Sequence, residues 1–556
     1  MGNLDSARMY QITATLRVQT DLVQMWVEQG LEVDEDELAH SAHFFEEQIY
    51  PTNHDYFGSE WSPGIDGDPH LIILNANVQG AAGYFALANE YPRDMNPYSN
   101  ECEMFVINAA SLQPGTTAYH ATLAHEFQHM IHWHSDRNEE AWLNEGASEL
   151  AEELNGFTVS RSAIKAFERQ PDLQLNTWTS DPDTMGAHYG ASHLFLRYAL
   201  TRFGPHTLKA VVQNPQNGIW SFDGPLQEYE PALSFDALFA DWVVANILDQ
   251  SAFGDERYLY PDMDVNAEIV ERVQSYPHTI EGSVHQYGAD YIELVGIEKY
   301  PSTGDGGSSL RISFSGTPHV KLVPNTPASG RFQWWSNRGD ASHSSLERTF
   351  DLTDVSTATL SFNLWYDIEK NWDYAYVRAS TDGGRTWQLL HGSHMQSKDP
   401  SMPALGPGYT GKSGTTEDKA EWVRERLALD AFCGKQVTIR FDYLTDDAVN
   451  APGLCLDDFC IEALAFHDDV ESGEDGWHAE GFMRHDNRLT QNYLVQIVEF
   501  SSAPRIRPIP VDTQGRGEAV IEGFGEEVPR ALLIVAATAP VTTETAIYRI
   551  NLEKLP

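Results

Sequence analysis

The chain has 556 residues, of which 41% are hydrophobic and 11% aromatic, and this composition predicts a globular protein of roughly three or four folding units. Its 82 acidic residues outnumber 36 basic ones, and the formal net charge of -46 excludes nucleic acid and anionic membranes as expected partners. No stretch approaches about 18 continuous apolar residues, so no transmembrane segment is expected, and the first residues lack the basic and apolar regions of a signal peptide.

The first half of the chain predicts an α+β domain. Apolar runs such as HLIILNANV and EMFVINA are mixed with longer helical periods, and helical patterns continue through LSFDALFADWVVANILDQ. The pattern changes after the Pro- and Asp-rich stretch at residues 260–264. We therefore expect the first domain to cover residues 1–270.

The second half of the chain predicts β-structure. Short alternating segments such as YIELVG, ATLSFNLWYDI and QVTIRFDYL are separated by clusters of Gly, Asp, Asn and Pro, which predicts a jelly-roll-type β-sandwich over residues 271–465. YLVQIVEF, AVIEGF and RALLIVAATA predict the strands of a small β domain over residues 466–556. Cys433, Cys455 and Cys460 lie near one another in the sequence, which favours one local disulfide.

The segment TTAYHATLAHEFQHMIHWH predicts one helix, with Thr116 or Thr117 as its N-cap. Helical spacing places four apolar side chains in one buried stripe: Leu123, Phe127, Met130 and Ile131. His125, Glu126 and His129 fall on another face of the same helix. That face is therefore available for chemistry.

The spacing of His125 and His129 suits a metal ion. Histidines at i and i+4 stand one helical turn apart, so both imidazoles can reach a single Zn2+ at about 2.0 to 2.1 Å. In this H-E-x-x-H arrangement the carboxylate of Glu126 can accept a proton from a water that the metal activates. His132 lies two turns from His125, too far to share the same zinc.

The segment AWLNEGASELAEEL predicts a second helix that begins near Asn144, with Glu145 and Glu149 on one face. The loop after His129 is long enough for this helix to return antiparallel and present Glu145 as the third zinc ligand. Glu149 would then be an orienting acceptor for a ligand histidine.

These residues resemble the gluzincin metallopeptidases, in which H-E-x-x-H is followed by N-E-x-x-S-[DE], here Asn144, Glu145, Ser148 and Glu149. HEFQHMIHW and WLNEGAS are most similar to the hyicolysin-type branch, although the loop between the two helices is shorter than in thermolysin-like members. That difference leaves the choice of Glu145 over Glu149 as ligand open. The resemblance implies a zincin catalytic domain, and the lack of a G-A-M-E-N-like sequence favours an endopeptidase over an aminopeptidase.

The resemblance also suggests two further elements of a peptidase site. Similar enzymes place a Tyr or His near the start of a later helix to stabilise the oxyanion, and of His188 and Tyr189 we favour Tyr189. An ordinary packing tyrosine is the alternative. The segment NECEMFVINAA is either an edge strand that pairs with an extended substrate or a plain core strand.

Three stretches of the second half resemble the C-terminal β-sandwich module of immune inhibitor A metallopeptidases: WWSNRGDASHSSLERTFDLT, LSFNLWYDIEKNWDYAYVRASTDGGRTW and VTIRFDYLTDDAVNAPGLCLDDFCI. The similarity covers about residues 280–500. It implies a secreted protease whose sandwich assists stability, substrate contact or surface attachment.

Carboxylates at turns and strand ends of this region are candidate calcium ligands: Asp340, Glu369, Asp373, Asp457 and Asp458. As a group they predict one Ca2+ site, although each alone is as readily a turn residue or a solvated charge. The loop SPGIDGDPH, with Asp66 and Asp68, is a weaker calcium candidate because a Gly- and Pro-containing turn explains it adequately.

The residues and the resemblance together predict a monomeric zinc endopeptidase that acts on proteins or peptides, and the resemblance implies that it is secreted. A rival from another class is an adhesive or glycan-binding secreted protein in which the zinc is only structural. A third possibility is a zinc hydrolase with a substrate other than peptides. Turnover of casein against that of esters or glycans separates these alternatives.

Overall fold

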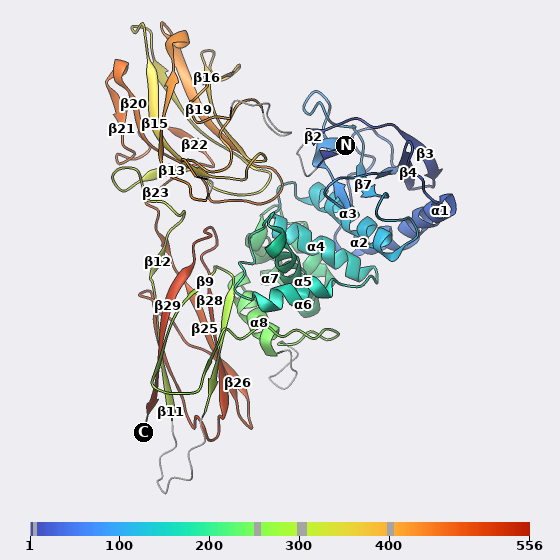
Figure 1. The fold of residues 1–556 in the computed structure, drawn as a ribbon, viewed down its shortest axis with the longest axis vertical. Helices are drawn as coiled ribbons and strands as arrows, with labels where there is room; N and C mark the ends of the chain where they lie inside the picture. Colours follow the sequence, from blue (N-terminus) through green and yellow to red (C-terminus); the bar gives the residue numbers. More distant parts are fainter. Residues whose placement is uncertain are drawn as a thin grey trace. The chain divides into compact units, whose positions relative to one another are not determined.

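The computed structural model describes residues 2–3, 8–248, 257–296, 309–396, 405–416 and 418–555 (Figure 1). The chain forms two compact units, and each is assembled from three segments. The first consists of Met1–Val159, Pro205–Asn217 and Thr326–Asp486, and the second of Ser160–Gly204, Gly218–Asn325 and Asn487–Pro556. Helices are concentrated in the N-terminal half and β-sheets in the C-terminal half. Among the described helices, none combines the length and the apolar character that crossing a bilayer requires.

A mixed five-stranded sheet begins the first unit. In spatial order its strands are β3 (Ala14–Gln19), β4 (Val23–Glu28), β5 (Leu71–Ala76), β7 (Met104–Asn108) and β6 (Gly83–Phe85). β4, β5 and β7 are parallel, whereas β3 and β6 run antiparallel to their neighbours at the two edges. β7, which belongs to the segment NECEMFVINAA, is thus a core strand, and β6 is the edge strand beside it.

The helices of the same part of the first unit are α1 (Glu35–Phe44), α2 (Tyr50–Tyr56), α3 (Thr117–Ser135) and α4 (Ala141–Leu154), with a π-helical turn at Phe45–Ile49. Thr116 is the N-cap of α3, because its side chain accepts a hydrogen bond from the backbone N–H of Tyr119. The apolar stripe of α3 lies in the core as predicted, and Leu123 and Phe127 are fully buried.

Buried amide side chains fix α3 relative to its neighbours. Asn53 of α2 donates to the carbonyl of Ala124 at 2.9 Å, and Asn155 donates to Asn53 Oδ1 at 2.8 Å. On the sheet side, the hydroxyl of Tyr119 donates to Asn75 Oδ1 at 2.6 Å. A buried polar group that lacks a hydrogen-bond partner destabilises the fold most where water is excluded. Because these buried groups find partners only when α3 lies where it does, their hydrogen bonds favour one position of the helix.

The first unit also contains a β-sandwich. One of its sheets has, in spatial order, β18 (Val423–Ala428), β15 (Thr359–Asp367), β20 (Gly453–Ile461), β13 (Gln333–Trp335) and β23 (Met483–His485), with β21 (Phe466–Asp468) also paired to β20. The other has β17 (Gln388–Leu389), β16 (Tyr374–Ser380), β19 (Gln436–Leu444), β14 (His343–Asp351) and β22 (His478–Glu480). Alternating side chains of both sheets share one core, in which the rings of Phe362 and Phe441 lie 5.0 Å apart.

The helices of the second unit are α5 (Arg161–Arg169), α6 (Pro182–Val212), α7 (Asp223–Tyr229) and α8 (Phe235–Leu248). α6 is interrupted at Gly204, whose φ of 79° precedes Pro205, and the chain passes into the first unit at this point. Gly190 of α6 permits a close approach to α5, because a Cβ there would lie 2.3 Å from the carbonyl oxygen of Ala163.

Two further sheets of the second unit pack around a common core of their own. The first has β26 (Arg505–Pro508), β25 (Tyr493–Phe500), β28 (Arg530–Ala537), β10 (Ala289–Val295) and β8 (Glu271–Val273). The second has β27 (Arg516–Ile521), β11 (Ser309–Gly316), β29 (Ala546–Leu555) and β9 (His278–Val284). Short ladders join β12 (His319–Val320) to β24 (Leu489–Thr490) and β1 (Gly2–Asn3) to β2 (Arg8–Met9).

The sheets divide the β region differently from the predicted ranges 271–465 and 466–556. β10 pairs with β28 and β11 pairs with β29, so strands from both ends of the β region form one sandwich. The sandwich between β13 and β23 is inserted between them. Alternation in a sequence identifies strands, but it does not identify a partner more than 200 residues away. The predicted local disulfide is also absent, since none of the four cysteines forms a disulfide bond.

Candidate metal centre

Helices α3 and α4 are joined by a short loop and pack against each other, and together they carry the predicted metal ligands. Their contact is tied by Ser148, whose hydroxyl donates to Gln128 Oε1 at 2.6 Å in the buried interface. Gly146 and Ala147 of α4 are also buried, and neither carries an atom beyond Cβ. α4 begins at Ala141, three residues before the predicted start, because its first N–H finds a partner elsewhere in the chain.

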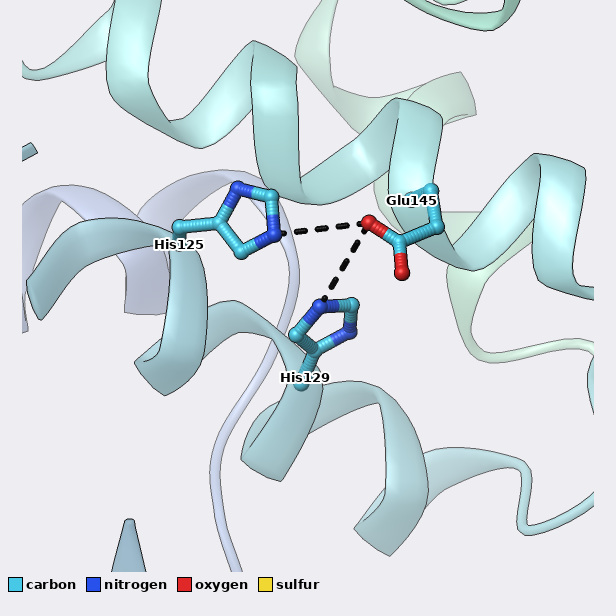
Figure 2. Close-up of side chains that lie close together, drawn as sticks. All are labelled: His125, His129 and Glu145. Atoms are coloured by element: carbon cyan, nitrogen blue, oxygen red, sulfur yellow. Dashed lines mark ion pairs between the residues drawn. The ribbon is translucent and has the colours of Figure 1, made fainter. Parts of the chain in front are cut away.

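The three predicted zinc ligands come together at this helix pair (Figure 2). Nε2 of His125 lies 3.4 Å from Oε2 of Glu145, and Nε2 of His129 lies 3.8 Å from the same oxygen. Two ligands of a tetrahedral zinc ion stand roughly 3.3 Å apart when each lies about 2.0 Å from the metal. The donor set of two imidazoles and one carboxylate therefore fits a zinc ion in both chemistry and spacing.

The second nitrogen of each imidazole is turned toward an acceptor. Nδ1 of His125 lies 3.1 Å from Oε1 of Glu152, and Nδ1 of His129 lies 3.0 Å from Oδ1 of Asn144. With the Nδ1 proton donated to these oxygens, each Nε2 keeps its lone pair for a metal. Burial works against a charged imidazole, but the carboxylates of Glu145 and Glu152 still raise the pKa of His125 well above its usual value.

Glu152 takes the orienting position that was predicted for Glu149. The structure gives the hydrogen bond to His125 to Glu152, while Glu149 lies in the same cluster, with its ligand atom within 4.8 Å of those of the other two. Burial, followed by the charge of Glu152, raises the pKa of Glu149 to about 7. Glu152 lies seven residues after Glu145, two turns along the same face, and that spacing was the signal that could have identified it.

Glu126 is buried beside the three ligands, with 5% of the residue exposed. Burial, together with the negative charge of Glu145, raises the pKa of its carboxyl to about 7, although the charge of His125 acts in the opposite direction. A carboxyl with a pKa near neutrality can both accept and return a proton.

The edge strand β6 lies against Glu126, a feature that the sequence patterns missed. A Cβ on Gly83 would lie 3.0 Å from Oε1 of Glu126 and 2.8 Å from the carbonyl oxygen of Val106. The backbone of Phe85 also forms a hydrogen bond that lowers the pKa of Glu126. The edge of the sheet, the buried carboxylate and the metal ligands thus form one continuous site.

Tyr189 and His188 lie on α6 in the second unit, whereas the metal ligands belong to the first. The ring of Tyr189 packs edge-on against Trp178, with 4.8 Å between the ring centroids. His188 is buried, and burial lowers its pKa to about 4. Stabilisation of an oxyanion by Tyr189 stays a prediction.

The predicted calcium ligands separate into two groups. Glu369 and Asp373 lie together with Asp446, which was not predicted, and Asp340 is close to them. Asp457 and Asp458 instead accept hydrogen bonds from Ser329. Oδ2 of Asp457 accepts from the backbone N–H of Ser329 at 3.0 Å, and Oδ1 of Asp458 accepts from the hydroxyl of Ser329 at 2.7 Å. The five residues therefore do not form a single site.

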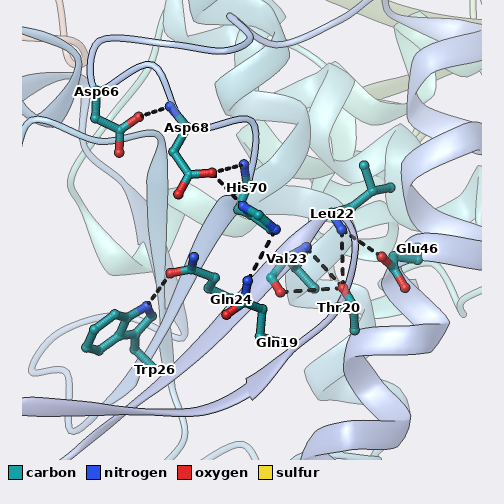
Figure 3. Close-up of polar contacts among 10 residues, drawn as sticks. All are labelled: Gln19, Thr20, Leu22, Val23, Gln24, Trp26, Glu46, Asp66, Asp68 and His70. Carbon is teal, nitrogen blue, oxygen red and sulfur yellow. Dashed lines mark hydrogen bonds and ion pairs between the residues drawn. The ribbon is translucent and has the colours of Figure 1, made fainter.

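The loop with Asp66 and Asp68 is built as a turn (Figure 3). Oδ1 of Asp66 accepts from the N–H of Asp68 at 2.8 Å, and Oδ1 of Asp68 accepts from the N–H of His70 at 3.1 Å. Asp68 also forms an ion pair with the ring of His70. Such local acceptor bonds are typical of Asx turns, which agrees with the turn interpretation of this loop.

Comparison with known proteins identifies one family within the chain. The "Immune inhibitor A-like, MAM domain" family matches residues 315–487, which contain the inserted sandwich from β13 to β23. The match is shorter than the predicted similarity over about residues 280–500, and it ends where that sandwich ends.

The relatives of this chain include two proteins named as metalloproteases and one named as an immune inhibitor. Pre-pro-metalloprotease PrtV of Vibrio cholerae is 35% identical over 145 residues, which cover 26% of this chain and 14% of that protein. Immune inhibitor A of Bacillus thuringiensis is 29% identical over 177 residues, which cover 31% of this chain and 23% of that protein. Neutral metalloprotease ShpI of Staphylococcus hyicus is 23% identical over 230 residues, which cover 36% of this chain and 51% of that protein. The chain is thus related to metalloproteases, but it spans about half or less of the length of each.

The comparison with solved structures adds nothing to this relationship. The alignment with a structure of infectious bursal disease virus, Gt strain, covers 50% of this chain and 80% of the viral chain, and the sequences are 11% identical. The TM-score of 0.12 is too low to indicate a common fold.

Proposed function

We propose that this chain is a zinc-dependent endopeptidase of the gluzincin type, with a zincin catalytic domain that acts outside the cell as a monomer on proteins or peptides. One observation carries the proposal: two imidazole nitrogens and the Glu145 carboxylate converge on one point, with the carboxylate of Glu126 buried beside it. The similarity to PrtV and ShpI, both named as metalloproteases, supports the same conclusion.

The side chains have separate roles in the proposed reaction. His125, His129 and Glu145 would hold the zinc ion, and Glu152 and Asn144 would orient the two imidazoles. A bound zinc ion would act as a Lewis acid that raises the acidity of a water molecule and polarises the peptide carbonyl. Glu126 accepts the proton of the attacking water and delivers it to the nitrogen of the leaving amine as the C–N bond breaks.

Cleavage within a polypeptide requires an extended substrate to lie across the site. β6 is the edge strand of its sheet and contacts the Glu126 carboxylate, so it is the element to which we assign substrate pairing. Backbone pairing at a sheet edge needs no free terminus, which agrees with an endopeptidase. Tyr189 is proposed as the donor that stabilises the oxyanion, as the family resemblance implies.

The test compares Glu126→Gln with the wild type in zinc content and casein hydrolysis. We expect the variant to keep about one zinc per chain and to lose roughly 10²- to 10⁴-fold in hydrolysis, because only the proton transfer is removed. Glu47→Gln makes the same chemical change at an exposed position and serves as the matched control. Wild-type turnover by Glu126→Gln would overturn the assigned mechanism. Zinc binding without casein cleavage in the wild type would instead favour an adhesive role or a hydrolase with another substrate.

A further inference from the structure

The two ring nitrogens of His125 face different carboxylates. Nε2 lies 3.4 Å from Oε2 of Glu145, and the other ring nitrogen points away from that oxygen (Figure 2). This second nitrogen, Nδ1, lies 3.1 Å from Oε1 of Glu152. Glu149, one turn before Glu152 on α4, completes the group, because one ligand atom from each of these three residues lies within 4.8 Å of the others. A second set of metal-ligating atoms therefore adjoins the predicted zinc site.

The outer nitrogen of His125 has more acceptors around it than its orientation requires. At His129, the other histidine of the pair, Nδ1 lies 3.0 Å from the amide oxygen of Asn144, a neutral acceptor that fixes the ring. At His125 the carboxylate of Glu152 takes this role, and the carboxylate of Glu149 is present in addition. The second carboxylate is therefore not needed to orient the ring.

Glu149 brings a negative charge to this group without a partner of its own. No residue in the described ranges forms a hydrogen bond or an ion pair with its side chain, which is affected only by burial and by neighbouring charges. Glu152 forms an ion pair with the ring of His125, and within the same ranges neither carboxylate pairs with a lysine or an arginine. Two adjacent carboxylates repel each other, and a cation between them would remove that repulsion.

We propose that Nδ1 of His125 and the carboxylates of Glu149 and Glu152 bind a second zinc ion, so that the imidazole ring bridges two metal positions. Zinc accepts nitrogen and carboxylate oxygen ligands at about 2.0 to 2.2 Å, and donors on one ion then stand about 3.3 to 3.5 Å apart, which small side-chain rotations achieve here. On binding, Nδ1 releases its proton to water and the ring becomes an imidazolate. Bonds to the metal replace the hydrogen bond between Nδ1 and Glu152, and water completes the tetrahedral shell.

The two helices hold this second group in position and leave it open to solvent. The buried hydrogen bond from Ser148 to Gln128, at 2.6 Å, ties α4 to α3. Glu149 and Glu152 are three residues apart on α4, so they share one face of the helix. The side chain of Glu152 is 23% exposed, so an ion can reach it from solvent without passing through the first metal position.

A second ion would strengthen the bond between His125 and the first. An imidazolate is a stronger electron donor than a neutral imidazole, so Nε2 would hold the first ion more tightly and release it more slowly. This effect rests on the proposed function, because it takes the first ion to be the zinc of the peptidase site. Binding at the second position requires only the donor atoms around Nδ1.

The binding test measures the zinc stoichiometry of the full chain by equilibrium dialysis at increasing free zinc. Glu149→Gln removes one ligand and leaves the contact between His125 and Glu152 in place. Glu153→Gln makes the same change one turn further along α4, outside the group, and is the matched control. Carboxylates elsewhere in this acidic chain also take up zinc weakly, so the result is the difference between the variants.

We expect the wild type and Glu153→Gln each to bind one zinc more than Glu149→Gln, while all three keep the first ion. Retention of the first ion also shows that the variant is folded. Equal stoichiometry in all three proteins would overturn the second site. Loss of the first ion in Glu149→Gln would also overturn it, because Glu149 would then be a ligand of the first ion.

Copper tests whether His125 bridges the two positions, since Cu2+ binds the same donor types as zinc. With Cu2+ in both positions, an imidazolate bridge couples the two electron spins antiferromagnetically. The EPR intensity of the wild type at low temperature should therefore stay well below the amount of copper bound, whereas Glu149→Gln with one Cu2+ should give the full single-ion intensity. Full intensity from two bound Cu2+ in the wild type would overturn the bridge, because the second ion would then lie away from His125.

The effect on the first ion is measured by zinc exchange. The first position is loaded with isotopically enriched zinc, and its replacement by zinc from the buffer is followed by mass spectrometry. As free zinc fills the second position, exchange should slow at least several-fold in the wild type but not in Glu149→Gln. A wild-type rate that does not fall would overturn the assigned effect. None of these measurements depends on proteolysis, so failure of the peptidase proposal is detected separately by the casein assay.

Discussion

The carboxylate of Glu152 lies 3.1 Å from Nδ1 of His125, on the side of the ring away from Glu145. The imidazole is therefore held between two carboxylates of the same helix, two turns apart on α4. One of them faces the metal position, and the other fixes the ring. This arrangement gives separate, measurable roles to residues that look equivalent in the sequence.

Replacement of Glu152 by alanine should weaken zinc binding about 10- to 100-fold, because His125 loses the acceptor that sets its orientation and tautomer. Zinc affinity measured by competition with a chelator of known affinity checks this. Glu149→Ala is the matched variant, one turn earlier on the same helix, and should weaken zinc less. A larger loss in Glu149→Ala would return the orienting role to the residue predicted from the sequence.

Gly83→Ala tests whether the edge strand β6 must lie close to Glu126. The added Cβ would meet the carbonyl oxygen of Val106 at 2.8 Å and Oε1 of Glu126 at 3.0 Å, so the strand or the carboxylate has to move. A shift of the reacting groups by about 1 Å can cost on the order of 10²-fold in rate. We expect kcat/KM for a peptide substrate to fall by that order while zinc content stays at the wild-type level. Loss of zinc along with activity would show that the strand supports the ligands instead.

The zinc helices could be predicted from the sequence because their information is local. Helical periodicity places Leu123 and Phe127 in the core and His125 and His129 together on another face, and the short loop after α3 brings Glu145 back to them. Such relationships depend only on spacing along the chain.

The remaining features depend on contacts between distant segments. β6 has only three residues, too few for a strand pattern, and its edge position follows from its pairing with β7. The start of α4 at Ala141 depends on an acceptor at Asp340, in the inserted sandwich. Asp446 joins Glu369 and Asp373 only because β19 ends next to the turn before β16. Residue types alone could not distinguish it from Asp457.

Removal of the third zinc ligand should separate metal binding from folding. Glu145→Ala leaves two imidazoles, which hold zinc far less tightly than three ligands, so we expect loss of the ion at micromolar zinc. The wild type should unfold at a higher temperature with zinc than without it, because zinc binds only the folded state, and the variant should show no such difference. Retention of stoichiometric zinc by Glu145→Ala, measured by elemental analysis, would point to Glu149 as the ligand.

A final prediction concerns the pH dependence of the inserted sandwich. Asp442 is a buried residue of β19, the strand between β14 and β16. Its Oδ2 accepts a hydrogen bond from Nε of Arg378 at 2.6 Å, and its Oδ1 lies 2.8 Å from Nε2 of His343. Burial alone would raise its pKa, but these hydrogen bonds and charges hold the pKa below the ordinary value of 3.8. A group with a depressed folded-state pKa stabilises the fold above its unfolded pKa, near 3.9, and loses that contribution as the pH falls through the folded value.

We therefore expect the free energy of unfolding of this sandwich to include a contribution from Asp442 that is constant between about pH 5 and pH 8 and declines below about pH 4. Asp442→Asn should lose about 3 kcal/mol at neutral pH, because Arg378 keeps its charge without the buried partner, and should lack this acid-dependent decline. Urea unfolding read by pulsed hydrogen exchange on peptides from β16 and β19 isolates the sandwich from the rest of the chain. Asp354→Asn, at an exposed turn position, is the control: its stability at neutral pH and its acid-dependent decline should both stay close to those of the wild type. An equal acid-dependent decline in Asp442→Asn would assign that decline to other carboxylates.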